Sequence, residues 1–330
     1  MQYSKYIGHA SQIAGVEEHR LVGGKGDGLR LFEAKNGLGL ACTVVPDRAA
    51  DIYRLSFRGY NMGYFSPSGY VAPAYYERSG AEWLRSFTAG FLTTCGLTNA
   101  GGPEQDEIDE LGLHGSIANT PAEQAYWEQT EDALIIKAKI RDARLFGRNL
   151  ELNRQIAIST KDNTLTITDT VENHADVASP VMLLYHMNMG YPLLSEKAKL
   201  EIASDSVTAR TEHAQKDLDT WFKVLPPTAG FEEQCYFHTF EKEGKAKIFN
   251  PEIGVGLSIH FDPKVLPCFC QWKMMGEHAY VMGLEPGNCL PAGQSGNRNE
   301  GLLQTLQPGE SKTYQFTVRF HSDADSWNNA

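Results

Sequence analysis

Apolar and polar residues alternate with a period of two in several segments of the chain. In residues 163–171, Leu165, Ile167 and Val171 fall on one face, and threonines fall on the other. Residues 312–320 place their aromatic side chains on one face in the same way. Because successive side chains of a β-strand point to opposite sides of a sheet, this alternation predicts half-buried antiparallel strands.

Turn-forming pairs such as Asn36–Gly37 and Pro308–Gly309 separate the alternating segments. Helical periodicity is scarce, and we expect only short helices near residues 81–85 or 214–219. No tract of linker composition divides the 330 residues, a length within reach of one large β-sandwich or barrel. The sequence therefore predicts an all-β fold of antiparallel sheets with few short helices, in a single domain over residues 1–330.

The amino-acid composition indicates which classes of binding partner to expect. The formal net charge of −11 argues against binding to nucleic acid or to an anionic membrane surface, and it favours a small-molecule partner. No segment approaches the roughly 18 consecutive apolar residues of a membrane span. Residues 1–6 contain no apolar core of a secretion signal. The six cysteines are dispersed, which indicates reduced thiols and predicts a cytoplasmic location.

The sequence contains none of the short motifs that bind common cofactors. It has no G-x-G-x-x-G after a strand, no phosphate-binding loop and no G-x-S-x-G elbow. The ten histidines form no H-x-H, H-x-x-x-H or H-E-x-x-H pattern. We therefore expect neither a cofactor nor a metal. A metal site assembled from distant strands stays open as an alternative, with Glu233, Cys235 and His238 as its members.

Two predicted strand ends carry groups that can exchange protons. The apolar segment 183–191 contains His186, and the segment 283–287 contains Glu285. Asn188 lies two residues after His186 and shares its face of the strand. Burying two unpartnered polar side chains would cost on the order of a few kcal/mol, which favours a polar cavity around them. An imidazole and a carboxylate in such positions form an acid/base pair. The alternatives are a core histidine bonded to backbone and a glutamate in an exposed turn.

Loops and aromatic residues indicate where a ligand could bind. Loops with glycine beside polar side chains at strand ends often carry sites, and two such loops contain Asn99 and His114. An aromatic ring can stack on the C–H face of a sugar, while an arginine or a lysine can donate to its hydroxyls. The residues that offer these groups are Trp83, Arg85, Trp272 and Lys273. Each tryptophan could equally belong to the core, and exposed basic residues such as Arg298 are ordinary.

Four short motifs follow one another in a fixed order along the chain. They are Gly112–Gly115, Tyr185–Asn188, Leu284–Pro286 and Leu306–Glu310. In this order they resemble the galactose mutarotase (aldose 1-epimerase) family, and most of all its poorly characterised aldose-epimerase-like branch. The resemblance extends over roughly residues 20–320. It implies a β-supersandwich with a sugar-binding cleft on one sheet, a small-molecule sugar as partner and no cofactor.

The resemblance also assigns roles to individual residues. Glu285 corresponds to the general base of the family and His186 to its general acid. His114 corresponds to a histidine that contacts the substrate near its ring oxygen, and Arg85 to a substrate-binding arginine. In this mechanism Glu285 takes the proton of the C1 hydroxyl, while a cationic His186 protonates the ring oxygen. The family also has a sugar-binding aspartate, and the one counterpart that we can name for it in this chain is Asp219.

The surroundings of the acid depart from the usual Asn-His-x-x-Phe-Asn pattern, because this chain has Tyr185-His186-Met187-Asn188-Met189. The sugar and the reaction therefore stay open. The function implied first is anomer interconversion by acid/base ring opening. The alternatives are another sugar epimerase, isomerase or lyase on the same fold, and a sugar-binding sensor without catalysis. The sequence does not decide between a monomer and a homodimer.

Overall fold

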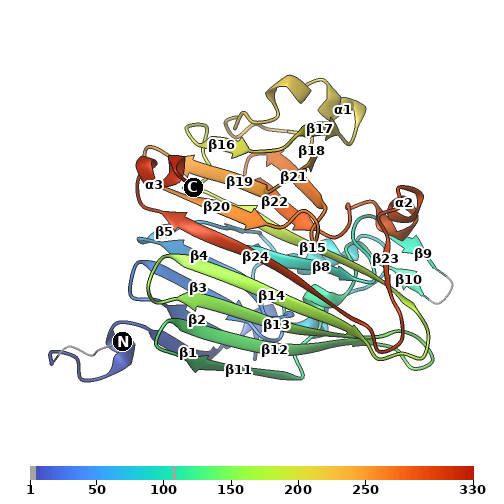
Figure 1. Cartoon of the computed structure of the whole chain (residues 1–330), viewed down its shortest axis with the longest axis horizontal. Helices are drawn as coiled ribbons and strands as arrows, with labels where there is room; N and C mark the ends of the chain where they lie inside the picture. The colour runs from blue at the N-terminus through green and yellow to red at the C-terminus, as the bar shows by residue number, and fades with distance from the viewer. Residues whose placement is uncertain (1–4, 107–108) are drawn as a thin grey trace.

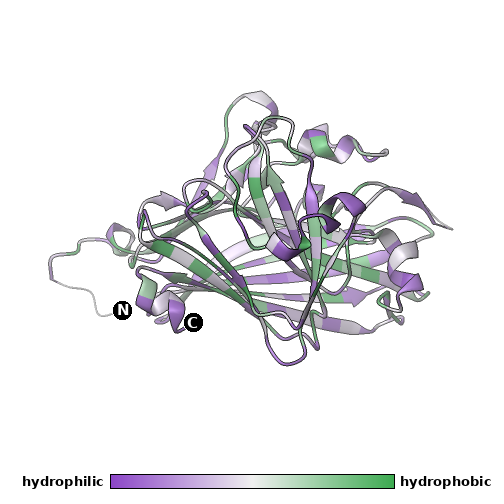
Figure 2. Cartoon of the chain, turned by 90° about the horizontal axis from the view of Figure 1, so that it is seen from above, coloured by the Kyte–Doolittle hydropathy of each residue, from purple (hydrophilic) through white to green (hydrophobic). Residues whose placement is uncertain are grey.

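The computed structural model describes residues 5–106 and 109–330. Part of the N-terminal stretch 1–6 and part of the acidic run Glu104–Glu110 therefore lie outside the described residues. Two large antiparallel sheets and a smaller one make up most of the molecule (Figure 1). Hydrophobic and hydrophilic residues alternate along the long strands (Figure 2). The predicted all-β class is confirmed.

The largest sheet has eight strands. In spatial order they are β11 (Gln124–Gln129), β12 (Ala133–Ala143), β13 (Asn149–Ser159), β14 (Thr164–Asn173), β24 (Ser311–His321), β20 (Val255–Phe261), β19 (Gly244–Asn250) and β16 (Lys199–Ile202). In β14 the predicted inward residues Leu165, Ile167 and Val171 are buried. They pack in one large apolar core that this sheet shares with the other two.

The second sheet has seven strands. They are β17 (Ser206–Ala209), β18 (Gln234–Thr239), β21 (Cys268–Met275), β22 (Tyr280–Gly287), β15 (Ser179–Met189) and β23 (Gln304–Leu306) in spatial order, with β8 (Leu92–Leu97) paired to β15. Strands β17 and β18 lie with a short helix at the top of the molecule in Figure 1. They form the edge of this sheet that is farthest from β15.

The remaining elements are short. The five-stranded sheet consists of β1 (Gly15–Arg20), β2 (Arg30–Lys35), β3 (Leu40–Val45), β4 (Asp51–Phe57) and β5 (Tyr60–Asn61). Two further strand pairs are β6 (Tyr64–Phe65) with β7 (Ala89–Gly90), and β9 (Glu104–Gln105) with β10 (Glu110–Leu111). The α-helices are α1 (Glu212–Gln215), α2 (Gly293–Asn299) and α3 (Ala324–Asn328). Among the described residues, no helix has the length and apolar character needed to cross a membrane.

Single turns of 3-10 helix occur in the connections. They are η1 (Ala10–Gln12), η2 (Gly24–Gly26), η3 (Pro73–Tyr75), η4 (Glu82–Ser86), η5 (Ile117–Asn119) and η6 (Leu218–Thr220). The short helix predicted near residues 81–85 corresponds to η4. The one predicted near residues 214–219 is divided between α1 and η6.

Strand β15 lies in the interior of the second sheet and is paired on both sides, to β8 and to β22. Both of its faces are covered, so nearly all of its residues are buried. Alternation sends Tyr185 and Met187 into the core between the sheets. It sends His186 to the other face, which is the outer face of the sandwich at this point.

A buried ion network connects the three sheets beneath β15. Arg154 of β13 donates to Asp169 of β14, with Nη2 2.7 Å from Oδ2, and to Asp51 of β4, with Nη1 2.8 Å from Oδ1. Its Nη2 also donates to the hydroxyl of Thr94 on β8 at 2.8 Å. The hydroxyl of Tyr185 on β15 donates to Asp169 at 2.9 Å. The arginine and both aspartates are at most 1% exposed, so this charge is balanced inside the protein.

We expect Arg154→Met to lower the free energy of unfolding by about 3–5 kcal/mol, because it leaves two buried carboxylates without their cation. Denaturant titration followed by circular dichroism measures this change. Arg319→Met is the matched control, since Arg319 lies exposed on the neighbouring sheet surface. It should change stability by no more than about 0.5 kcal/mol. Equal stability of the two variants would contradict a supporting role for the network.

Candidate functional site

His186 and Glu285 lie next to each other on neighbouring strands. Met187 of β15 pairs with Leu284 of β22, which puts His186 opposite Glu285. The Nε2 atom of His186 is 3.3 Å from Oε1 of Glu285, and the two side chains are 8% and 2% exposed. Neither a backbone-bonded core histidine nor an exposed turn glutamate describes this arrangement.

The space that holds the Glu285 carboxylate is created by a missing side chain. Gly283 lies two residues earlier on β22, on the same face. A Cβ atom at Gly283 would lie 2.1 Å from Oε1 of Glu285 and 3.0 Å from Cβ of Trp272. The glycine therefore allows the carboxylate to fold back along its own strand toward His186.

A cavity of about 300 Å³ opens over this pair. Its aromatic walls include Trp83, Phe87 and Trp272. Trp83 and Phe87 stack on each other with their ring centroids 4.5 Å apart, and the ring of Trp272 lies edge-on to that of His186 at 5.2 Å. A site that combines apolar ring faces with a few convergent polar groups is typical of small-molecule binding.

His114 reaches the same cavity from a tight loop. Its backbone has a φ of 56°, and Gly115 follows with a φ of 72°. A Cβ atom at Gly115 would lie 2.2 Å from the carbonyl oxygen of Gly96, so the loop requires a glycine there. The Nδ1 atom of His114 accepts a hydrogen bond from the backbone N–H of Gly101 at 3.3 Å. The neutral ring then carries its proton on Nε2 and can act as a donor.

Burial determines the charge of this site. It lowers the pKa of His186 to about 3, and nearby His114 lowers it further while the Asn188 amide raises it. Burial likewise lowers the pKa of His114 to about 4, with Arg210 as the second cause. The pKa of Glu285 is raised well above 4.5, first by burial and then by Cys235 and Glu233. Both shifts therefore favour a neutral imidazole beside a protonated carboxyl group.

This distribution is the reverse of the one that the mechanism inferred from the sequence requires. That mechanism needs a cationic His186 beside an ionised Glu285. Burial instead favours a neutral imidazole and a protonated carboxyl group, because both charged forms lose their hydration. A ligand that donates hydrogen bonds to the carboxylate would favour transfer of the proton to His186.

Asn188 does not line the cavity, although the sequence suggested it as a substrate ligand. Its side chain is fully buried behind His186, and its Nδ2 donates to the backbone carbonyl of His186 at 2.9 Å. Within the described part of the chain, Oδ1 of Asn188 and Nδ1 of His186 both lack a hydrogen-bond partner. The two atoms belong to side chains on the same face, where the amide can orient the ring.

Trp272 and Lys273 were both expected to contact a ligand, but they are neighbours on β21 and so face opposite sides of the sheet. Trp272 lines the cavity. Lys273 is 1% exposed on the opposite face, where burial lowers its pKa to about 8. The prediction of a binding role for Lys273 is wrong in its geometry, because alternation allows only one of the two to reach the cavity.

Arg85 and Asn99 also lie outside the cavity wall. Arg85 is on the exposed side of η4, where it pairs with Glu82, because Trp83 of the same turn takes the inward position. Asn99 is fully buried and donates to the backbone carbonyls of Gly102 and Gly112, each at 2.9 Å. It connects the two loops that carry cavity residues and has a structural role.

Sequence reasoning missed Arg210 and Glu233 as cavity residues. Arg210 follows the short edge strand β17, and Glu233 precedes β18. The Oε2 atom of Glu233 accepts a hydrogen bond from Nε1 of Trp272 at 2.8 Å. The sequence predicted Arg85 as the cation of the cavity, but Arg210 is the arginine that lines it. Nothing in the local sequence marks it, because only the pairing of β17 with β18 brings it there.

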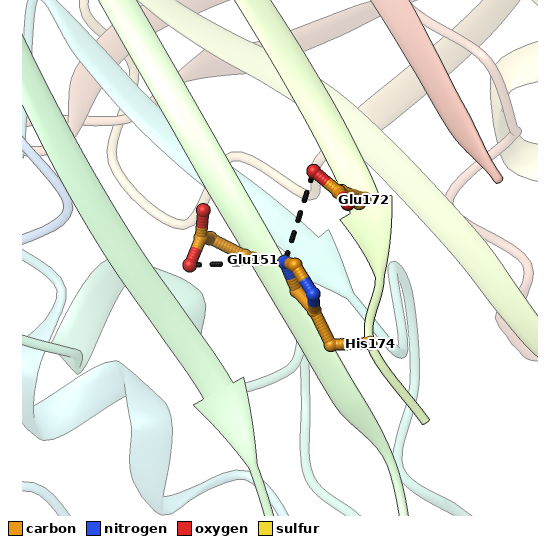
Figure 3. A group of neighbouring side chains, drawn as sticks. All are labelled: Glu151, Glu172 and His174. Atoms are coloured by element: carbon orange, nitrogen blue, oxygen red, sulfur yellow. Dashed lines mark ion pairs between the residues drawn. The ribbon is translucent and has the colours of Figure 1, made fainter. Parts of the chain in front are cut away.

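The metal site suggested by Glu233, Cys235 and His238 does not form. Cys235 faces the cavity, whereas His238 faces the other side of β18 and contacts Gln271 and Ser204. In the part of the chain that the structure describes, one other group has the spacing of metal ligands, namely Glu151, Glu172 and His174 (Figure 3).

His174 pairs with both carboxylates of that group (Figure 3), and cations already engage the buried one, Glu151. Oε1 of Glu151 is 3.0 Å from Nζ of Lys139, and its other oxygen pairs with Arg141. A divalent ion would have to displace both side chains. We therefore assign Glu151 to an ion-pair cluster of the sheet surface.

Comparison with known proteins identifies the fold. None of the curated proteins matches this sequence. A candidate aldose 1-epimerase from Klebsiella pneumoniae subsp. pneumoniae MGH 78578 has a TM-score of 0.87 at 26% identity, over 95% of this chain and 85% of that chain. A galactose mutarotase-like protein from Clostridium acetobutylicum has a TM-score of 0.68 at 13% identity, over 94% of this chain and 99% of that one.

A galactose 1-epimerase from Lactobacillus acidophilus NCFM has a TM-score of 0.61 at 13% identity, again over 94% of this chain and 99% of that one. These likenesses confirm the galactose mutarotase-like β-sandwich that the order of the sequence motifs predicted. The family described as Domain of unknown function (DUF4432) matches residues 26–320. This span covers most of the sequence, and the chain therefore belongs to the DUF4432 family.

Proposed function

We propose that this protein is an aldose 1-epimerase-like isomerase that interconverts the anomers of a sugar. The observation that carries the proposal is the pair of buried groups on β15 and β22. A carboxylate and an imidazole 3.3 Å apart face a cavity walled by aromatic rings. A protein that only binds a sugar needs the rings and hydrogen-bond donors, but it has no need of a desolvated proton-exchanging pair.

Anomer interconversion needs two proton transfers. Glu285 takes the proton from the C1 hydroxyl, and His186 gives a proton to the ring oxygen, so the C1–O bond of the ring opens to the aldehyde. Rotation about C1–C2 and closure with the roles reversed give the other anomer. A positioned acid or base typically contributes about 10²–10⁴-fold to such a rate. The bound sugar supports the charged pair by donating its hydroxyl hydrogen bonds to the Glu285 carboxylate.

The remaining polar groups suit a polyhydroxylated ligand. His114 offers an N–H donor, Arg210 offers a cation, and Glu233 offers an acceptor already fixed by Trp272. The Trp272 and Trp83 rings provide apolar faces for the C–H groups of a sugar. Because acidic and basic groups both line the cavity, recognition of a neutral sugar requires no compensating ion.

We expect Glu285→Gln to reduce anomer exchange by about 10²–10⁴-fold, because the nearly isosteric amide cannot accept the hydroxyl proton. Saturation-transfer NMR on a panel of aldoses measures the exchange. Glu172→Gln, on the outer face of the other large sheet, is the matched control and should keep wild-type exchange. Wild-type exchange in Glu285→Gln would refute the assignment of the base. Sugar binding without exchange in the wild type would favour a sensor.

We expect Gly283→Ala to fold normally but to lose about 10²-fold in exchange, because the new Cβ atom displaces the Glu285 carboxylate by contact at 2.1 Å. Gly276→Ala is the control on the same sheet, where the nearest atom is the flexible Cε of Met274 at 3.1 Å. Thermal melts verify folding, and the NMR exchange assay measures turnover. Unchanged exchange in Gly283→Ala would mean that the position of this carboxylate does not matter.

We expect Glu285→Gln to be more stable than the wild type, by an amount that grows as the pH rises above 4.5. The unfolded carboxyl group ionises near 4.5, whereas the folded one resists ionisation because its pKa is raised. Wild-type stability therefore falls with rising pH until the folded group ionises too, and the glutamine variant lacks this loss. Denaturant titrations of both proteins from acidic to mildly alkaline pH measure the difference. A difference that is independent of pH would contradict the raised pKa.

A further inference from the structure

Two cysteines form part of the cavity wall on adjacent strands. Cys235 of β18 pairs with Trp272 of β21, and Phe237 pairs with Cys270. Cys235 and Cys270 are therefore diagonal neighbours on one face of the sheet, and both line the cavity. Their side chains therefore face the same space.

A cation accompanies one thiol of the pair. The Nη1 atom of Arg210 donates to Sγ of Cys235 at 3.8 Å. A guanidinium keeps its charge at any physiological pH, so it stabilises a thiolate beside it. The neighbouring Cys270 thiol and the charge of Arg210 hold the pKa of Cys235 below its ordinary value, although burial opposes them. The pKa of Cys270 is raised well above its ordinary value, so the two thiols are chemically distinct.

The other four cysteines have no such environment. Cys42, Cys95, Cys268 and Cys289 are buried, lie outside this cavity and have pKa values raised by burial. Cys268 is a close comparison for Cys270, because it lies two residues earlier on β21 and on the same face. A reagent in the cavity would meet the Cys235 sulfur beside a guanidinium, with the Cys270 thiol next to it.

We propose that Cys235 and Cys270 form a redox-active thiol pair in the cavity wall that reacts with hydroperoxides. The Cys235 thiolate attacks one oxygen of hydrogen peroxide, the O–O bond breaks, and a sulfenic acid and hydroxide result. The Cys270 sulfur then attacks the sulfenic sulfur, a disulfide forms, and the S–O bond breaks. Each thiol has released one proton, and the two hydroxides take up these two protons to form water. Two thiols and one peroxide thus give one disulfide and two waters.

The geometry makes this disulfide strained and therefore easily reduced. Diagonal neighbours of an antiparallel pair have Cα atoms about 7–8 Å apart, whereas disulfides span about 4.4–6.8 Å. The backbone of β18 must therefore shift along β21 when the bond forms. Strain raises the reduction potential of a disulfide, so a thiol reductant restores the open pair.

Oxidation would reach the acid/base pair through Cys270. Cys270 pairs with Glu285 across the two strands, and both residues line the cavity. The disulfide removes the S–H group opposite Glu285 and moves the sulfur away from it. Oxidised protein should therefore lose exchange activity until it is reduced. This consequence rests on the proposed function, whereas formation of the bond does not.

The test treats the full chain with hydrogen peroxide and follows it by intact mass and by peptide mapping after alkylation. We expect wild type and the matched control Cys268→Ser to lose two hydrogen atoms, to contain a 235–270 cross-link and to revert with dithiothreitol. Cys270→Ser should stop at a sulfenic acid on Cys235, which dimedone traps. Cys235 should react more than about tenfold faster than Cys268 in the wild type.

Either of two results would overturn the proposal. One is reaction of Cys235 no faster than Cys268, and the other is overoxidation of Cys235 in the wild type without a cross-link. Wild-type mapping gives both answers even if a serine variant fails to fold. Because the mass readout involves no sugar, failure of the thiol chemistry and failure of the epimerase assignment are separate outcomes.

Discussion

The guanidinium of Arg154 lies in the interior, where two aspartates and a threonine from three other strands surround it. Desolvating three charges is expensive, and only a complete set of partners compensates for it. The five-stranded sheet and both large sheets must therefore meet in one relative position. Tyr185 joins this network and directly precedes His186. The same set of contacts that joins the sheets thus fixes the strand from which the imidazole projects.

In the site next to that network, desolvation determines which protonation states of the side chains are favoured. Burial favours the neutral forms of both His186 and Glu285, so that it lowers the pKa of the first and raises the pKa of the second. Such a pair is poised but uncharged, and a ligand must supply the hydrogen bonds that stabilise its ionic form. Gly283 contributes by its lack of a side chain, because the carboxylate occupies the volume that a Cβ atom would take.

The sequence was informative wherever a local pattern determines geometry. Alternation identified the strands that carry His186 and Glu285. Both residues line one cavity, as do Trp272, which was chosen for its aromatic ring, and His114 from its glycine-flanked loop. Alternation also explains the error at Lys273, which follows Trp272 and so faces away. The prediction that Arg85 contacts a ligand failed because the 3-10 turn directs Trp83 toward the cavity and leaves Arg85 exposed. Arg210, Glu233 and the thiol pair depend on which strands become neighbours, and strand pairing between distant segments leaves no local signal. The match to DUF4432 extends over the chain but supplies no chemistry of its own.

Strand β15 is hydrogen-bonded on both sides and covered on both faces, whereas β17 and β18 form the edge of the same sheet. Amides of an inner strand open only with global unfolding, while edge elements open at lower free energy. The two groups that we propose to move protons therefore lie on the most stable part of this sheet, whereas Arg210 and Glu233 flank its edge. Mutations that reshape the edge can alter which ligand enters without disturbing His186 and Glu285. In evolutionary terms, such an arrangement allows the pair to be retained while ligand specificity diverges.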